Sequence, residues 1–246
     1  MRYTLGIDIG STTVKVALLK EEPRAGAPFT LLFSDYRRHF ANIRETLSSL
    51  LQEACAVSGD VTVYPRITGS GGLTLAKHLG VPFVQEVVAV SSSLKALLPK
   101  TNVAIELGGE DAKIIYFDQG IEQRMNGPCA GGTGAFIDQM GAFVGTDAAG
   151  LDALAAKSRR LYPIASRCGV FAKMDILPLL NEGCAREDIA ASVLQAVVNQ
   201  TISGLAHGRK IQGKVVFLGG PLSFLPFLRT CFTNTLKDIR EAVFPE

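Results

Sequence analysis

Two cysteines stand in glycine-rich surroundings that suit metal binding. Cys129 lies in Met125-Asn-Gly-Pro-Cys-Ala-Gly-Gly-Thr-Gly-Ala-Phe136, immediately before an expected helix, and Cys168 lies in Ser166-Arg-Cys-Gly-Val-Phe-Ala-Lys173, ahead of a helical run. A helix N-terminus presents free N–H groups and a partial positive charge, which lower the pKa of a thiol and suit a thiolate bound to a metal or an anionic cluster. A [4Fe–4S] cluster normally needs four thiolates, so with this pair as ligands the other two would come from a second copy of the chain.

The alternative is that the cysteines are small apolar core residues, which is the usual role of an isolated cysteine in an intracellular protein. We assign that role to Cys55 in the helical pattern 47–56, to Cys184 and to Cys231. It stays open for Cys129 and Cys168 taken alone, because their separation is not a compact metal-binding spacing such as C-x2-C.

A phosphate-binding loop is predicted near the N-terminus, in Gly6-Ile-Asp-Ile-Gly-Ser-Thr-Thr-Val-Lys15. Asp8 ends a strand and Gly10 lets the backbone approach a ligand closely. Backbone N–H groups and three hydroxyls can donate to phosphate oxygens; the hydroxyls are those of Ser11, Thr12 and Thr13. Asp8 can then hold Mg²⁺ through water, because Mg²⁺ keeps much of its hydration in protein sites.

A second loop repeats this arrangement in Ile105-Glu-Leu-Gly-Gly-Glu-Asp-Ala-Lys113, with Glu106 where the first loop has Asp8. Its turn contains Gly108, Gly109 and Asp111, and a third glycine turn ends Val215-Val-Phe-Leu-Gly-Gly220. One such loop could equally be a tight hairpin turn. Two loops at equivalent points of a repeat favour phosphate binding, and neither is a Walker A motif, because no G-x4-G-K-[ST] is present.

The elements around these loops fall into two related halves. In the first half we expect strands at 3–9, 13–19, 29–36, 63–68 and 83–84 and helices at 43–57, 74–78 and 89–98. In the second half we expect strands at 102–107, 113–117, 122–125 and 215–218 and helices at 135–143, 151–157 and 189–211. The order strand, glycine turn, strand, strand, helix occurs twice. This predicts a duplicated α/β fold, divided into 1–98 and 99–246, with a cleft between the copies.

Composition excludes several classes of protein. A chain of 246 residues with 47% hydrophobic residues, 25 Gly and no Trp fits a compact α/β protein. A net charge of +2 without a basic block argues against a nucleic-acid partner. The N-terminus has no signal-peptide pattern and the apolar runs are far shorter than about 18 residues, so we expect a cytoplasmic protein with no membrane span. Five cysteines without a signal peptide argue against a disulfide framework.

The loops and the third glycine turn resemble the acetate and sugar kinase/Hsp70/actin superfamily, in which two RNase H-like halves clamp ATP. Four segments together are similar to the activators of 2-hydroxyacyl-CoA dehydratases and the related benzoyl-CoA reductase ATPase subunits. They are Leu5-Gly-Ile-Asp-Ile-Gly-Ser-Thr12, Gly108-Gly-Glu-Asp-Ala-Lys113, Asn126-Gly-Pro-Cys-Ala-Gly-Gly-Thr-Gly-Ala-Phe136 and Ser166-Arg-Cys-Gly-Val-Phe-Ala172. The similarity spans nearly the whole chain, and the two cysteine motifs in this order are its specific part.

The resemblance implies a homodimer with one [4Fe–4S] cluster on the twofold axis, ligated by Cys129 and Cys168 of each subunit. From the residues themselves we expect the Thr133 and Ser166 hydroxyls to donate hydrogen bonds to the cluster sulfurs. It implies ATP and Mg²⁺ at the loops, with Asp8 and Glu106 as catalytic carboxylates. The implied nucleotide-binding residues are Gly10, Ser11, Thr12, Thr13, Lys15, Gly108, Gly109, Asp111, Gly219 and Gly220. ATP would drive one electron to a 2-hydroxyacyl-CoA dehydratase-like or benzoyl-CoA reductase-like partner, and reduced ferredoxin or flavodoxin would supply it.

Two departures from the family pattern and two alternative functions accompany this interpretation. Glu106 stands where many superfamily members have Asp, and the chain stops at Pro245-Glu246 where relatives continue. We therefore expect a second half shortened at its C-terminus, or a fragment of a longer polypeptide that also carries the partner region. One alternative is a sugar-type kinase with Asp111 as the base, which leaves both cysteines unexplained. The other is a non-catalytic nucleotide-dependent scaffold, which predicts ATP binding without iron.

Overall fold

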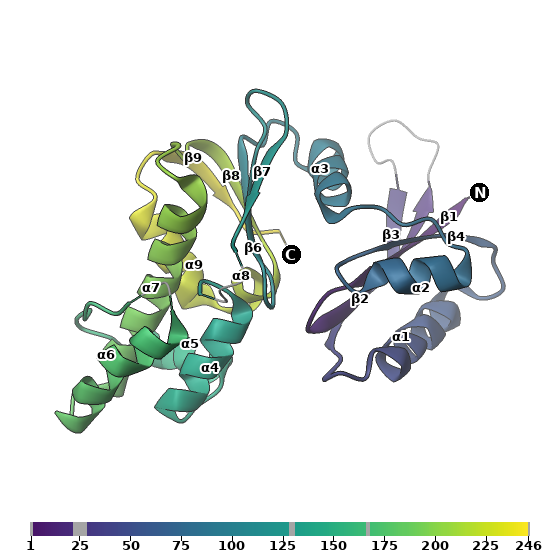
Figure 1. Ribbon diagram of the computed structural model, residues 1–246. Coiled ribbons are helices and arrows are strands. Elements are labelled where there is room, and N and C mark those ends of the chain that lie inside the picture. Colours follow the sequence, from purple (N-terminus) through teal and green to yellow (C-terminus); the bar gives the residue numbers. More distant parts are fainter. Residues whose placement is uncertain (1, 22–28, 128–130, 166–167, 246) are drawn as a thin grey trace. The chain divides into compact units, whose positions relative to one another are not determined.

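The computed structural model describes residues 2–21, 29–127, 131–165 and 168–245, shown in colour in Figure 1. The chain divides into two compact units, Met1–Ser93 and Leu94–Glu246. Each unit has its own sheet and its own hydrophobic core. Helix α3 (Glu86–Leu97) carries the chain from the first unit into the second.

The first unit contains a sheet in the order β3-β2-β1-β4. Its strands are β1 (Tyr3–Ile9), β2 (Thr13–Glu21), β3 (Phe29–Arg38) and β4 (Val63–Thr68). The hairpin partners β1, β2 and β3 are antiparallel, and β4 runs parallel to β1. Its two other helices, α1 (Ile43–Ser58) and α2 (Gly72–Leu79), pack against β2 and β3 and against β4, respectively.

Alternation along β1 and β2 decides which face of this sheet is the core. Leu5, Ile7 and Ile9 of β1 are buried, and so are Val14, Val16 and Leu18 of β2. Successive side chains of a strand point to opposite faces, so Asp8 and its cross-strand neighbour Lys15 lie on the other face. Burial of each large aliphatic side chain stabilises the unit by roughly 1.5–3 kcal/mol, and this fixes the register that pairs the two charged residues.

The second unit contains a sheet in the order β7-β6-β5-β8-β9. Its strands are β5 (Val103–Leu107), β6 (Ala112–Tyr116), β7 (Glu122–Met125), β8 (Gly213–Leu218) and β9 (Ile239–Val243). Strands β5, β6 and β7 are antiparallel, whereas β8 runs parallel to both β5 and β9. Its helices are α4 (Gly134–Val144), α5 (Ala148–Ala155), α6 (Gly169–Asn181), α7 (Arg186–Ala206), α8 (Gly220–Phe224) and α9 (Pro226–Thr235).

Helix α7 is the central helix of the second unit. It contacts α4, α5, α6 and α9 and the strands β6 and β7, and Figure 1 shows it beside the other helices of this unit. By length and composition α7 could cross a membrane, but 67% of its most apolar window is buried inside the unit. The apolar character of α7 is therefore explained by its place in the core.

The predicted elements occur in the predicted order in both units, with one helix shorter than expected, one strand reduced to a bridge and two further helices. The helix expected at 189–211 ends at Ala206, because His207 and Gly208 adopt φ angles of 45° and 81°. The strand expected at 83–84 is a single bridge between Ile67 and Phe83. The sequence did not predict α8 and α9, each of which has a proline in its first turn.

Candidate functional site

The two units contain the same hairpin turn at the end of their first strand. In the first unit the Gly10 N–H donates to the Thr13 carbonyl at 2.9 Å, and in the second the Gly108 N–H donates to the Asp111 carbonyl at 2.7 Å. An acidic residue precedes each turn glycine by two positions and faces a lysine across the hairpin. These directly opposite pairs are Asp8 with Lys15 and Glu106 with Lys113.

Each turn is also met by a glycine from the neighbouring parallel strand. Gly69 follows β4 and Gly219 follows β8, and both have φ of +94°. A Cβ on Gly69 would lie 2.3 Å from the Ile9 carbonyl oxygen, and one on Gly219 would lie 2.0 Å from that of Leu107. The parallel strand can therefore approach the hairpin this closely only with glycine at these positions. The likeness of the two units extends beyond the hairpins to this third segment.

In the first turn, Lys15 and Asp8 form an ion pair with 2.6 Å between Nζ and Oδ2. The other carboxylate oxygen, Oδ1, is buried and has no hydrogen-bond partner among the described residues, and the same holds for Oγ1 of Thr68. Asp8 and Thr68 are paired in register across β1 and β4. A carboxylate and a hydroxyl oxygen side by side fit a hydrated Mg²⁺, which is bound through oxygen atoms and water.

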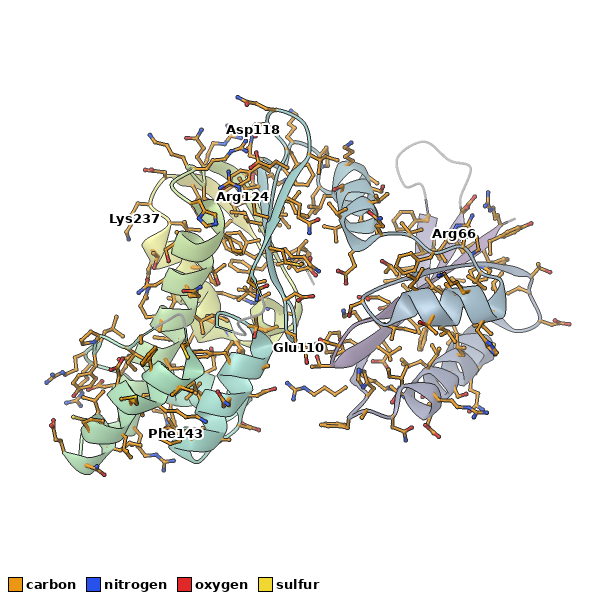
Figure 2. The ribbon with its side chains drawn as sticks, in the orientation of Figure 1. Arg66, Glu110, Asp118, Arg124, Phe143 and Lys237 are labelled. Atoms are coloured by element: carbon orange, nitrogen blue, oxygen red, sulfur yellow. The ribbon has the colours of Figure 1, made fainter. Side chains whose placement is uncertain are left out.

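In the second turn, the first N–H groups of α4 are bound to the loop. The Gly134 N–H donates to the Gly108 carbonyl at 2.9 Å and the Ala135 N–H donates to the Gly109 carbonyl at 2.7 Å. Figure 2 labels Glu110 in this turn, at the end of β6 opposite to Asp118. Lys113 is buried, whereas Glu106 and Asp111 are partly buried. The second predicted loop is thus joined directly to the helix that follows the Cys129 segment.

Cys168 is the N-cap residue of α6, and its side chain is partly exposed. The backbone N–H groups of Phe171 and Val170 in the first turn of α6 lower the pKa of the thiol. The sequence argument placed this cysteine at a helix N-terminus for the same physical reason. Cys168, the one of the two predicted ligands that the structure describes, therefore has a thiol that ionises more easily than an ordinary cysteine.

The segment before Cys168 is held by side chains of α6 and α7. Asp188 accepts hydrogen bonds from the Arg159 and Arg160 N–H groups at 2.7 and 3.1 Å. Ser192 accepts one from the Tyr162 N–H at 2.8 Å, and Asp175 accepts one from the Ala165 N–H at 2.7 Å. These four bonds guide the chain toward Cys168. Gly169 then lies against α4, since a Cβ there would be 2.6 Å from Oε1 of Gln139.

The predicted ligand Cys129, together with Ser166, lies outside the described residues. Across the described ranges, no group of three or more His, Cys, Asp or Glu side chains could hold a metal ion. The remaining cysteines differ in burial: Cys231 is buried, Cys184 is partly buried and Cys55 is exposed. The core role expected for Cys55 is therefore wrong, because α1 presents it to solvent.

Helix α6 presents an exposed apolar face that begins two residues after Cys168. Val170 is 65% exposed, Phe171 59%, Met174 62% and Leu177 50%. Positions 170, 174 and 177 follow each other at helical spacing, so they share one side of the helix. Exposed apolar patches on a folded protein mark interaction surfaces. We call these four residues the α6 apolar face.

Three contributors to the first turn were missed in the sequence. Thr68 and Gly69 had a usable signal, because Gly69-Ser-Gly-Gly72 follows a strand in the same way that Gly219-Gly220 does. His39 had none: it contacts the turn through backbone carbonyls, which leave no mark in the sequence.

The chain matches the model of the BadF/BadG/BcrA/BcrD ATPase family over residues 5–241. It is 30% identical over 220 residues to the (R)-2-hydroxyglutaryl-CoA dehydratase activating ATPase of Acidaminococcus fermentans, covering 89% of this chain and 82% of the relative. It is 29% identical over 221 residues to the 2-hydroxyisocaproyl-CoA dehydratase activator of Clostridioides difficile, covering 89% and 80%.

Solved structures show the same likeness. Component A of the Acidaminococcus fermentans (R)-2-hydroxyglutaryl-CoA dehydratase has a TM-score of 0.85 and 26% identity, over 99% of this chain and 92% of that one. The activator of the 2-hydroxyisocaproyl-CoA dehydratase from Clostridium difficile, solved with bound ADPNP, has a TM-score of 0.82 and 25% identity, over 99% and 88%. The predicted duplicated RNase H-like fold of the actin-like ATPases is confirmed.

Proposed function

Because this chain belongs to the BadF/BadG/BcrA/BcrD ATPase family, we propose that it couples ATP hydrolysis to one-electron transfer from a [4Fe–4S] cluster to an acyl-CoA dehydratase-like partner. The observation that carries the proposal is the pairing of two equivalent turns with an easily ionised cysteine. The turns present Asp8 with Lys15 and Glu106 with Lys113, and Cys168 begins α6. Neither alternative function accounts for that cysteine.

The nucleotide is expected at the two turns. Ser11, Thr12 and Thr13 would donate hydrogen bonds to phosphate oxygens, and Lys15 would neutralise phosphate charge. Asp8 would hold the hydration shell of Mg²⁺, and Glu106 would orient the attacking water. Gly108, Gly109 and Asp111 of the second turn, and Gly219 with Gly220 after β8, would complete the nucleotide contacts. The ADPNP bound to the Clostridium difficile activator supports a nucleotide role for this fold.

Cys129 and Cys168 of two subunits would hold the cluster, which supplies the one-electron chemistry when bound. The N–H groups of Val170 and Phe171 already stabilise negative charge on the Cys168 sulfur. The α6 apolar face lies in the helix that Cys168 caps, and a second copy of the chain would bury that face. The exposed α6 apolar face and the need for four thiolate ligands support a homodimer.

The printed names of the relatives support the proposed partner. Relatives are named activators of 2-hydroxyglutaryl-CoA, 2-hydroxyisocaproyl-CoA and lactoyl-CoA dehydratases, and another is a component of the benzoyl-CoA reductase of Thauera aromatica. We therefore propose a 2-hydroxyacyl-CoA dehydratase-like or benzoyl-CoA reductase-like partner, on a separate chain or on a longer polypeptide. Reduced ferredoxin or flavodoxin is the proposed electron donor, and the cytoplasm is the proposed compartment.

Iron analysis of protein prepared without oxygen tests the cluster. We expect about four irons per dimer, as for one cluster with four thiolate ligands. Cys129→Ala and Cys168→Ala should each lose the iron and still bind Mg-ADPNP. Cys184→Ala, which changes a partly buried cysteine of the same unit, is the matched control and should keep the iron. Unchanged iron in Cys168→Ala would reject the ligand assignment, and ADPNP binding without any iron would favour the scaffold or kinase alternative.

A further inference from the structure

His39 is fastened to the first turn from the end of β3. Its backbone N–H donates to the Thr12 carbonyl at 3.1 Å, and its ring Nε2 lies 3.3 Å from the Gly10 carbonyl oxygen. His39 is only 7% exposed. Two carbonyl groups of the turn Gly10–Thr13 are therefore directed at this one residue.

The direction of those carbonyls sets the direction of the neighbouring N–H groups. In a planar trans peptide the C=O and the following N–H point in opposite directions. Because the Gly10 and Thr12 carbonyls point toward His39, the N–H groups of Ser11 and Thr13 point away from it. A phosphate-binding turn needs this arrangement, with its N–H groups on the side opposite to its carbonyls.

A second hydrogen bond fixes the tautomer and the orientation of the His39 ring. The Ala41 N–H donates to Nδ1 at 3.1 Å, so Nδ1 is an acceptor and carries no proton. In the neutral imidazole the proton then sits on Nε2, where it can donate to the Gly10 carbonyl. The ring thus bridges the Ala41 backbone and the turn.

This bridge requires an unusual backbone. Phe40 and Ala41 have φ angles of 45° and 65°, a left-handed conformation that non-glycine residues rarely adopt. The Phe40 side chain is 81% exposed, so its burial does not compensate for the strain. The strained turn does deliver the Ala41 N–H to Nδ1. Strained backbone that persists beside a binding loop points to a functional constraint.

We propose that His39 is a positioning residue for nucleotide binding, which holds the peptide groups of the first turn so that their N–H groups face the phosphates. The inference rests on the proposed function, because it takes the ligand to be ATP. His39 itself touches the turn and not the nucleotide. Its contribution is preorganisation: the turn has its binding conformation before the ligand arrives.

Two substitutions of His39 distinguish the contributions of its two ring nitrogens to nucleotide binding. Gln can place an N–H donor where Nε2 lies, so His39→Gln should keep the bond to the Gly10 carbonyl. Asn can place an acceptor where Nδ1 lies but does not reach Gly10, so His39→Asn should lose that bond. We expect the affinity for Mg-ADPNP, measured by calorimetry on the full chain, to fall about tenfold in His39→Asn and by less than about threefold in His39→Gln.

AMP binding separates positioning from general destabilisation. AMP lacks the β- and γ-phosphates, so a residue that acts only on the phosphate turn should leave AMP affinity unchanged while ADPNP affinity falls. His78→Asn, at an exposed histidine of α2, is the matched control and should leave both unchanged.

Three outcomes overturn the inference: equal ADPNP affinity in His39→Asn and wild type, equal losses in the Asn and Gln variants, or a parallel loss of AMP and ADPNP binding. Failure of the proposed function gives a different result: wild-type protein would then bind no Mg-ADPNP, or it would bind Mg-ADPNP but hold no iron.

Discussion

Gly69 and Gly219 occupy equivalent positions in the two units, each with φ of +94° and each pressed against the carbonyl of the residue before the turn glycine. The segments that contain these two glycines are far apart in the sequence and share no motif beyond glycine itself. It shows that each turn depends on three strands: the two of the hairpin and the parallel strand beside them. Substitution at these glycines should therefore affect stability, whereas substitution in the turn should affect binding.

We expect Gly69→Ala to destabilise the protein by well over 1 kcal/mol, because alanine adds both left-handed strain of about 1–3 kcal/mol and a clash with the Ile9 carbonyl. Gly219→Ala should behave alike. Gly80→Ala is the matched control, since Gly80 has φ of +63° but open space around its Cβ position, so it adds strain alone. Thermal unfolding followed by circular dichroism would measure this, and equal effects at Gly69 and Gly80 would contradict the clash.

The Gly10→Ala variant should fold normally but bind nucleotide more weakly than the wild type. Gly10 does not need a positive φ, and the closest atoms to its Cβ position are oxygens of Thr13 at 3.6 Å, with Nζ of Lys15 at 4.0 Å. The added methyl group would occupy the space beside the Lys15 ammonium, where phosphate is expected. Mg-ADPNP titration with unfolding as the companion measurement would check this, and unchanged affinity would place the phosphates elsewhere.

Asp8→Asn should slow Mg²⁺-dependent ATP hydrolysis more than it weakens nucleotide binding. Asn keeps the size of the side chain but removes the charge that pairs with Lys15 and that we propose holds the hydrated metal. We expect hydrolysis to fall at least about 100-fold, within the range that a lost electrostatic contact to the reacting group produces. Asp35→Asn, at a carboxylate paired with Arg37 on β3, is the control for loss of an ion pair. A normal hydrolysis rate in Asp8→Asn would show that Asp8 has no catalytic role in ATP hydrolysis.

The sequence predicted the turns and strands well because their residues are chemically specific. Glycine, hydroxyl and acidic residues at the end of an apolar strand have few other uses, so both hairpins were found. The helix that follows Cys168 was expected from the glycine beside it and the helical run after it. Contacts made through the backbone could not be predicted in this way. His39 contacts backbone carbonyls, and Asp188 and Ser192 accept hydrogen bonds from backbone N–H groups of a distant segment. Because nearly every residue type has these backbone groups, the sequence does not show which of them a side chain will contact.

Cys168 and Cys231 should react with iodoacetamide at very different pH. Backbone N–H groups lower the pKa of Cys168, whereas burial raises the pKa of Cys231 to about 12. Only the thiolate is alkylated, so in iron-free reduced protein Cys168 should react below the pH of an ordinary thiol while Cys231 stays inert. Mass spectrometry after timed labelling would measure both. Faster labelling of Cys231 than of Cys168 at neutral pH would contradict these environments.

The same shifts give opposite contributions to stability. At Cys231 the unfolded thiol ionises near 9.0, before the folded one, so its contribution is present below that pH and is lost as the pH rises toward about 12. At Cys168 the folded state binds fewer protons, so its contribution is present above the unfolded pKa and is lost as the pH falls. Cys231→Ala should therefore flatten the loss of stability between pH 9 and 12, as measured by urea denaturation.

Dimerisation and iron should be linked. If the cluster bridges two subunits, ligation stabilises only the dimer, so chelation should shift the protein toward monomer. Met174→Glu should weaken the dimer even with iron present, because it places a charge in the α6 apolar face. Val57→Glu, at an exposed apolar residue of α1, is the control and should not. Sedimentation would decide: an iron-loaded monomer would reject the shared-ligand geometry.

The topology of the second sheet also fixes the order in which the turns can form. In the first unit only one helix, α1, lies between β1 and its parallel partner β4, whereas four helices, α4, α5, α6 and α7, lie between β5 and its parallel partner β8. Closing so long a loop costs chain entropy and slows folding. During synthesis the Gly69 contact can form early, whereas the Leu107 contact cannot form until Gly219, which follows β8, has been synthesised. We therefore expect the second turn to be the last part of the site to become structured on the ribosome.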